Sequence, residues 1–332
     1  MKTSVSILSL TALSAFFFTM GCIAADDQEG TTDDATAAEE GHVGTASSAI
    51  IDGQAAQPWM QQRAVAVSTG GCTGTIISNK HVITAAHCKP VAGSTTVRFY
   101  NGSTTPSGPA VGVASVALRP GVDPFNDDLT DINGDFADIA ILTLTSNIPA
   151  TSAKSPLAIF YPGSDGVGIQ VGRGAHDGNP NPTAELRFAT NGLYSDDNSV
   201  GFFYTNDDHV NPGDSGGPFY TNGELQGDLW GYWYVAFATR NKYTAISYHL
   251  PWILSTIGFT GTFSQTFTNV VMVGTTLQTI GTSDLATCRL ACMQNSSCFG
   301  YAFQPFPASL CSLRRDDVGK DLSWAGAVSG IR

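Results

Sequence analysis

A serine stands between glycines in the run Gly213-Asp-Ser215-Gly-Gly-Pro218. A serine hydroxyl is a weak nucleophile unless a neighbouring base takes its proton. Glycines allow the backbone to approach a substrate carbonyl closely and to direct N–H groups at its oxygen. The run therefore predicts a nucleophile, Ser215, if another part of the chain supplies a base and a carboxylate that orients the base.

Two apolar, strand-like runs carry a candidate base and a candidate carboxylate. His87 follows the run Val82-Ile-Thr-Ala-Ala, and Asp138 opens the run Ile-Ala-Ile-Leu142. The apolar run would bury Asp138 behind the imidazole, and this favours it over the other nearby acids, Asp127, Asp128, Asp131 and Asp135. That acidic cluster could bind calcium, but its spacing matches no calcium-binding loop. The remaining histidines stand in no comparable context: His42, His81, His176, His209 and His249.

These three motifs together resemble the trypsin-like serine proteases of the chymotrypsin fold, in the family's order His, Asp, Ser. The resemblance implies that His87 takes the proton of Ser215 and later gives it to the leaving amine. It implies that Asp138 fixes the tautomer of His87, and that the N–H groups of Gly213 and Ser215 form an oxyanion hole. The alternative is a degenerate copy of the family without activity.

The composition suits a turn-rich β protein, with 42% hydrophobic residues, 13% charged residues and 36 glycines in 332 residues. The resemblance implies an all-β domain over residues 50–258, built of two six-stranded antiparallel Greek-key barrels with the active site between them. Tyr243 to Ile253 match the last strands and closing helix of the family. Short runs bounded by turn residues also predict an antiparallel barrel or sandwich, at residues 65–68, 75–78, 97–100, 111–118, 139–144 and 168–171.

The formal net charge is −12, and residues 1–49 contain seven acidic groups and one lysine. The rest of the chain therefore holds 21 acidic and 15 basic residues, a net charge of −6, with no basic patch. This excludes nucleic acid as a predicted partner. We expect a monomer that acts on protein or peptide substrates and needs no cofactor.

The N-terminus reads as an export signal. Lys2 precedes an apolar run from Ile7 to Phe18, which is too short to span a membrane as a helix. The following Thr19-Met-Gly-Cys22 resembles a bacterial lipoprotein cleavage site, although Thr19 stands where the motif usually has leucine. Ordinary cleavage near Ala24 is the alternative. We expect a signal peptide over residues 1–22. Either reading gives a secreted, extracellular protein in which disulfides can form, and a lipid on Cys22 would anchor the precursor to the membrane.

Residues 23–49 are acidic and poor in apolar residues, so they cannot bury enough surface to fold alone. They could be a linker or a propeptide. Ile50-Ile-Asp-Gly53 resembles the first residues of the mature enzyme in this family, and this favours an acidic propeptide and a zymogen. The resemblance implies that an activating protease frees the amine of Ile50, which then pairs with Asp214 in the interior. A buried ammonium needs such a partner.

The substrate-binding residues are only partly defined by the sequence. In trypsin itself a carboxylate six residues before the nucleophile selects Arg or Lys, and here that position is His209. A one-residue shift would bring Asp208 to the base of the pocket, whereas a histidine there could favour acidic substrates, so the specificity stays open. Trp230 and Gly231 are expected on the edge strand that binds the substrate backbone, with Gly231 or Tyr232 at the pocket mouth.

Six of the seven cysteines are expected to form disulfides. Cys72 and Cys88 bracket the strand that leads to His87, and the resemblance implies a bridge between them, worth about 3 kcal/mol for a loop of this size. No cysteine occurs between Cys88 and Cys288, so the bridges that many relatives carry beside the nucleophile are missing. The other four cluster near the C-terminus: Cys288, Cys292, Cys298 and Cys311.

Residues 265–332 form a predicted second, small α+β domain. Ser283 is a good N-cap for a helix over residues 284–294, and residues 299–303 and 310–313 read as strands. The pattern resembles a PAN/apple domain, which implies the bridges Cys288–Cys311 and Cys292–Cys298. Four cysteines alone allow three pairings. A zinc site is the rival, but the spacing fits no common zinc pattern, so we expect no metal.

PAN/apple domains bind proteins or carbohydrates, and the alternative role for this one is a stabilising cap without a ligand. Two functions therefore stand. One is a secreted serine endopeptidase that carries a binding module, and the other is an adhesion or binding protein on a silent protease scaffold. The intact motifs around His87, Asp138 and Ser215 favour the endopeptidase.

Overall fold

The computed structural model describes 50, 53–162, 166–175, 185–194, 201–206, 210–235, 238–282, 284–305, 309–316, 319–321 and 325–332. The predicted signal peptide, Cys22 and the propeptide lie outside these residues. So do His209, with the two aspartates before it, and Ser283.

Six antiparallel strands close a first barrel, and alternating side chains of several of them fill its core. In β5, Val97 and Phe99 point into the barrel core, whereas Arg98 points outward. In β2, Val65 and Val67 fill the barrel core, while Ala64 and Ala66 face a second core at the seam with the other barrel. The strands, in barrel order, are β2 (Ala64–Val67), β3 (Thr73–Ile76), β4 (His81–Thr84), β7 (Ala140–Leu144), β6 (Ser107–Leu118) and β5 (Thr96–Phe99).

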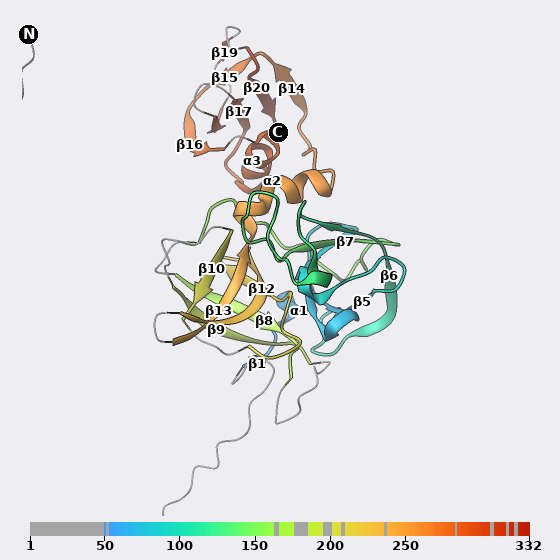
Figure 1. Ribbon diagram of the computed structural model, residues 1–332. Coiled ribbons are helices and arrows are strands. Elements are labelled where there is room, and N and C mark those ends of the chain that lie inside the picture. Colours follow the sequence, from blue (N-terminus) through green and yellow to red (C-terminus); the bar gives the residue numbers. More distant parts are fainter. Residues whose placement is uncertain are drawn as a thin grey trace, which may run out of the picture. The chain divides into compact units, whose positions relative to one another are not determined.

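Six further antiparallel strands form a second barrel, which the pairing of β8 with β9 closes (Figure 1). Its interior is aromatic: Phe203, Phe219 and Tyr243 pack together, with ring centroids 5.1–5.6 Å apart. The predicted pair of six-stranded antiparallel barrels is therefore confirmed. The strands are β8 (Val167–Gly172), β9 (Arg187–Tyr194), β10 (Phe202–Thr205), β13 (Ala238–Ala245), β12 (Glu224–Val235) and β11 (Pro218–Thr221), and β1 (Gln54–Ala55) adds to the edge of β9.

A third core joins the barrels. Ile83, Ile139 and Ile141 of the first barrel meet Val171 and Tyr220 of the second in one buried cluster. The helix α2 (Ile246–Thr256) follows β13, as predicted, and contributes its buried side chains to the same cluster. The short helix α1 (Pro58–Gln61) and single 3₁₀ turns at Thr69–Gly71, Ala86–Cys88 and Pro124–Asn126 complete this part of the chain.

The C-terminal module is a sheet with one helix, α3 (Leu285–Gln294), fixed to it by disulfides. Cys288 pairs with Cys311, and Cys292 pairs with Cys298, which are the bridges that the resemblance implies. The five-stranded sheet has the order β14 (Gln265–Thr268), β20 (Val328–Ile331), β17 (Gly300–Gln304), β18 (Leu310–Arg314) and β16 (Thr276–Gly281), and β15 (Val271–Val273) pairs with β19 (Gly319–Asp321).

The helix α3 begins one residue later than predicted. Its N-cap is Asp284, which was expected as the first helical residue, and the Asp284 carboxylate accepts the N–H of Thr287 at 2.7 Å. A carboxylate caps well because it accepts an unpaired N–H and lies at the positive end of the helix dipole.

The module packs directly on α2. Leu290 and Ala286 of α3, with Phe259, lie against the core cluster that α2 shares with the barrels. Gln294 of α3 donates from Nε2 to the carbonyl of Leu157 at 3.0 Å. Within the described ranges, no helix is long and apolar enough to cross a membrane.

Candidate active site

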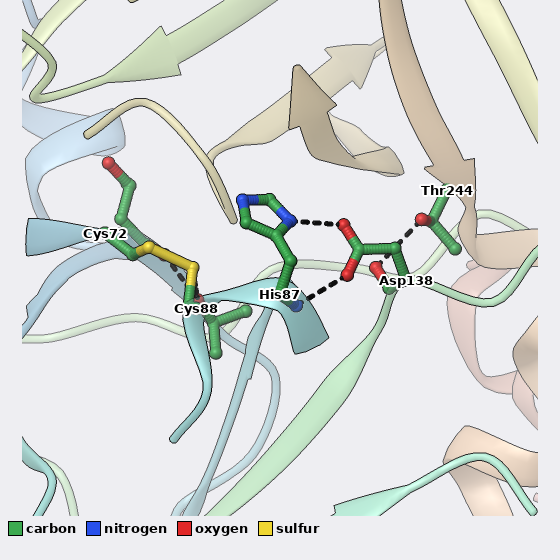
Figure 2. Close-up of polar contacts among 7 residues, drawn as sticks. Cys72, His87, Cys88, Asp138 and Thr244 are labelled. Carbon is green, nitrogen blue, oxygen red and sulfur yellow. Dashed lines mark hydrogen bonds and ion pairs between the residues drawn. A yellow bond between two sulfur atoms is a disulfide. The ribbon is translucent and has the colours of Figure 1, made fainter. Parts of the chain in front are cut away.

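His87 and Asp138 are in direct contact at the ends of two paired strands (Figure 2). Thr84 of β4 lies opposite Ala140 of β7, so the residues that flank this pair meet. His87 Nδ1 lies 2.7 Å from Asp138 Oδ2, and the backbone N–H of His87 donates to Asp138 Oδ1 at 2.8 Å. Asp138 is completely buried, and Thr244 of the second barrel donates from Oγ1 to its carbonyl at 2.9 Å.

This contact defines the protonation of the imidazole. A hydrogen bond from Nδ1–H to the Asp138 carboxylate leaves Nε2 as the free lone pair of His87. Burial alone would lower the pKa of His87, but the charge of Asp138 and its hydrogen bond outweigh burial, so the pKa lies above 6.5. The pair can therefore act as an oriented base.

The competing aspartates have other partners. Asp131 forms an ion pair with Arg119 and accepts backbone N–H groups at its turn. Asp135 accepts the hydroxyl of Tyr248 at 2.5 Å, and Asp127 lies 3.4 Å from Lys89. Asp128 caps its own turn through Thr130. None of these four contacts His87 in the part of the chain that the structure describes.

The disulfide Cys72–Cys88 fastens the histidine turn to β3 (Figure 2). Cys88 directly follows His87, and its Cα lies 6.3 Å from that of Cys72. Thr84 reinforces the link, because its Oγ1 donates to the carbonyl of Thr73 at 2.7 Å. The backbone of His87 is therefore held on both sides.

The turn that carries Ser215 is held by both barrels. Thr73 of the first barrel donates its N–H to the carbonyl of Ser215 at 2.8 Å and its hydroxyl to the carbonyl of Gly213 at 2.9 Å. On the other side, Gly216 donates its N–H to the carbonyl of Leu229 in β12 at 2.8 Å. Gly216 has φ 78°, and a Cβ there would lie 2.3 Å from the Thr73 carbonyl, so only glycine fits.

The predicted oxyanion donors are free. The N–H groups of Gly213 and Ser215 donate to no group within the described residues, and Gly213 has φ 105°. Ser215 itself is half-buried. No hydrogen bond joins its hydroxyl to His87 among the described side chains. Contacts between nucleophile and base often tighten only when substrate binds.

Asp214 lies in a sealed pocket with Ile50. Its Oδ2 accepts N–H groups from Ile50 at 3.4 Å and Asn211 at 2.9 Å, and its Oδ1 accepts that of Gly174 at 2.6 Å. A Cβ at Gly172 would lie 2.0 Å from Oδ1, so the pocket depends on that glycine. Burial raises the pKa of Asp214 to about 6, against the lowering effect of these three hydrogen bonds.

Trp230 and Gly231 lie on β12, where one edge of the strand is open. β13 pairs with β12 up to Val235, but β11 pairs with it only up to Asp228. Beyond Leu229 the second edge of β12 has no strand partner among the described residues. Tyr232, the other candidate for the pocket mouth, is 58% exposed. His209, the predicted pocket base, lies outside the described residues.

Two ionisable residues near Asp138 were not predicted from the sequence. Asp228 of β12 is buried, and neither of its carboxyl oxygens has a hydrogen-bond partner among the residues that the structure describes. Burial, together with the charge of Asp138, raises the pKa of Asp228 well above the usual range. Lys242 of β13 lies among aromatic rings close enough for Asp138 to affect its pKa. No signal in the sequence marks either residue, because long-range pairing of β12 and β13 brings them there.

The described residues contain no group of three or more His, Cys, Asp or Glu side chains placed to hold a metal ion. The four cysteines of the C-terminal module do not form a zinc site, because all four are disulfide-bonded.

Comparison with known proteins gives consistent matches. The profile of the trypsin family matches residues 50–253. Alkaline trypsin C of Manduca sexta is 33% identical over 179 residues, which cover 47% of this chain and 67% of that protein. Trypsin alpha of Drosophila erecta is 25% identical over 203 residues, which cover 56% and 77%.

Two solved structures share the fold. Mouse neuropsin, a serine protease, is 23% identical, with a TM-score of 0.52 over 62% of this chain and 99% of its own. An inactivated protease paralogue of the scabies mite is 21% identical, with a TM-score of 0.51 over 62% and 98%. Because one is named a protease and the other an inactivated paralogue, the shared fold alone does not decide activity.

Proposed function

Because the chain belongs to the trypsin family of serine proteases, we propose that it is a serine endopeptidase with His87, Asp138 and Ser215 as its catalytic triad. The observation that carries this proposal is the two-point contact of Asp138 with His87, at 2.7 Å and 2.8 Å. It leaves Nε2 of an oriented imidazole available as the base. Its substrates are proteins or peptides.

The mechanism follows from these positions. His87 Nε2 takes the proton of Ser215 as the hydroxyl attacks the substrate carbonyl carbon, and Asp138 stabilises the imidazolium. Negative charge grows on the carbonyl oxygen, where the N–H groups of Gly213 and Ser215 each supply about 3 kcal/mol. His87 then gives the proton to the leaving amine, and water repeats the sequence on the acyl-enzyme.

We further propose that the chain is made as a zymogen. The nitrogen of Ile50 is buried 3.4 Å from Asp214 Oδ2, which supports a pairing of the two. Cleavage after Ala49 would turn that amide nitrogen into an ammonium beside a buried carboxylate. Asp214 lies between Gly213 and Ser215, so this pair would order the oxyanion hole. The activating protease should prefer small residues, because Ser47-Ser48-Ala49 precede the bond.

The domain organisation proposed from the sequence is a signal peptide at 1–22, a propeptide at 23–49, the protease domain at 50–258 and a PAN/apple-like module at 265–332. The protein would be secreted. A lipid on Cys22 would stay with the propeptide, because Cys22 precedes the cut bond. No disulfide would then link the propeptide to the enzyme, because Cys22 is the only cysteine before Cys72 and a lipidated cysteine cannot form a disulfide. A disulfide-bonded helix on a sheet supports a module that binds protein or carbohydrate.

The test compares the mature protein, beginning at Ile50, with its Ser215→Ala variant. We expect Ser215→Ala to abolish casein hydrolysis and labelling by a fluorophosphonate while leaving the circular dichroism spectrum unchanged. Ser255→Ala, a change of an exposed serine on α2, is the matched control and should keep both activities. Equal labelling of wild type and Ser215→Ala would refute the assignment. A mature wild type that neither hydrolyses nor labels would instead support the silent binding protein.

A further inference from the structure

Lys242 of β13 lies in a cage of three aromatic rings. Its Nζ is 3.5 Å from the ring centroid of Phe136, 4.0 Å from that of Phe202 and 5.4 Å from that of Trp230. The rings brace one another edge to face, with the centroid of Phe136 5.4 Å from Phe202 and 6.3 Å from Trp230. Ring faces attract an ammonium and hold it in place.

Among the described side chains, the caged ammonium has no counterion of its own. Lys242 forms no hydrogen bond or ion pair within the described residues, so its three N–H donors have no fixed acceptor. The acid that acts on it is Asp138, but both oxygens of that carboxylate are bound by His87. Burial lowers the pKa of Lys242 to about 8, partly offset by Asp138, so the amine is still largely charged at pH 7.

Two of the three cage rings adjoin residues of the candidate active site. Phe136 is two residues before Asp138, and Trp230 directly follows Leu229, whose carbonyl holds Gly216 beside the nucleophile. From Trp230 onward one edge of β12 has no paired strand among the described residues. β12 belongs to the barrel that contains β10 and β13 (Figure 1). An extended chain can add to an open strand edge through its backbone.

We propose that Lys242 is a specificity-determining residue whose caged ammonium pairs with a carboxylate side chain of the substrate, two to four residues before the cut bond. This rests on the proposed function, because it assumes that the substrate's acyl part extends along β12. Successive side chains of an extended chain alternate in direction, so one in two would lie over Trp230 and Lys242. The substrate class is therefore a peptide with Glu or Asp upstream of the bond.

The cage makes this preference specific to charge. Three ring faces hold the ammonium in one place, so it is preorganised for an anion rather than free to turn into solvent. A glutamine has the same shape as glutamate but lacks the charge. We therefore expect kcat/KM for a Glu peptide to exceed that for the matched Gln peptide by about tenfold, and a Lys peptide to be cleaved more slowly than either.

The mature protein first digests casein, and mass spectrometry of the products identifies a bond that it cuts. One quenched fluorescent peptide is then built around that bond. Gln, Glu and Lys are placed in turn at the second, third and fourth residues before that bond. The variants are Lys242→Met, which keeps length and packs against aromatic rings, and Arg240→Met as the matched control. Arg240 is a cation on the same strand that contacts Tyr194 and Asn206 outside the cage.

Wild type and Arg240→Met should prefer Glu at one of the three positions. In Lys242→Met the ratio of kcat/KM for the Glu peptide to kcat/KM for the Gln peptide should fall to about one. A wild type without preference at any position, or a preference that survives in Lys242→Met, would overturn the proposal while the endopeptidase assignment stands. Failure of every peptide together with failure of fluorophosphonate labelling would overturn both.

Discussion

Cleavage before Ile50 should stabilise the folded protein as well as activate it. In the uncut chain Asp214 is fully buried, accepts N–H groups from Ile50, Asn211 and Gly174, and is also favoured in its ionised form by the charge of Arg173. Burial raises its pKa from 3.8 to about 6. At 1.36 kcal/mol per pKa unit, keeping this carboxylate ionised in the interior costs about 3 kcal/mol of folding free energy at neutral pH.

The pH window follows from the direction of this shift. A carboxyl group with a raised pKa in the folded state binds its proton more tightly there than in the unfolded chain. The destabilisation is therefore complete above pH 6, shrinks as the pH falls, and is absent below pH 3.8. A new ammonium at Ile50 would offset it, so the cleaved form should gain up to about 3 kcal/mol at pH 7.5. For a protein of this size that corresponds to a rise in Tm of about 6–12 °C.

The assay compares uncut and cleaved protein in a Ser215→Ala background, which prevents self-digestion, by urea unfolding and calorimetry at pH 7.5. Asp214→Asn in the same background is the control, because a neutral amide should remove most of the difference between uncut and cleaved forms. The reasoning is refuted if the two forms of the parent differ by less than about 1 kcal/mol. It is also refuted if Asp214→Asn leaves a 3 kcal/mol difference unchanged.

Three further outcomes are expected. The acid limb of kcat/KM should lie above pH 6.5, because Asp138 raises the pKa of His87. Asp138→Asn should lower kcat about 10⁴-fold and move that limb to lower pH. A limb that does not move would contradict the pairing of the two residues. Replacing Cys72 and Cys88 by serine should lower the free energy of unfolding by about 3 kcal/mol in urea, and an unchanged midpoint would show that the bridge adds nothing. The 50–262 fragment should cleave a short chromogenic peptide with a kcat/KM within tenfold, or about 1.4 kcal/mol, of that of the 50–332 form. It should unfold at a lower temperature, because α3 no longer covers α2. A larger loss of activity would show that the module contributes to the active site.

Only the family resemblance implied two six-stranded barrels, because the local pattern left a barrel or a sandwich open. Individual strands were predictable where core residues alternate with exposed ones. Val97 and Phe99 show this in the sequence, and the structure places both in the barrel core. Trp230 and Gly231 were expected on the edge strand, and β12, which carries both, continues to Val235, where aromatic and β-branched residues favour a strand. The start of α3 was ambiguous, because Ser283 and Asp284 are both good caps and only the fold selects between them.

Lys242 and Asp228 could not be predicted, since their properties arise from distant neighbours. The cage of Lys242 combines Phe136, Phe202 and Trp230, which come from three separate segments. Asp228 reads as an ordinary polar residue in a strand, and only the approach of Asp138 and the closure of the seam bury it. Residues of a motif can be recognised from the sequence alone. Residues that set the electrostatic field around the motif can be identified only from the tertiary structure.

The candidate site depends on a reciprocal exchange between the barrels. The nucleophile turn belongs to the second barrel, but its carbonyl at Ser215 is held by Thr73 of the first. Asp138 belongs to the first barrel, but its carbonyl is held by Thr244 of the second. A shift of one barrel against the other would break both bonds at once and change the distance between base and nucleophile. The buried seam around Ile139 and Tyr220 therefore contributes to catalytic geometry as well as to stability, because its packing, together with these hydrogen bonds, keeps the two barrels in register.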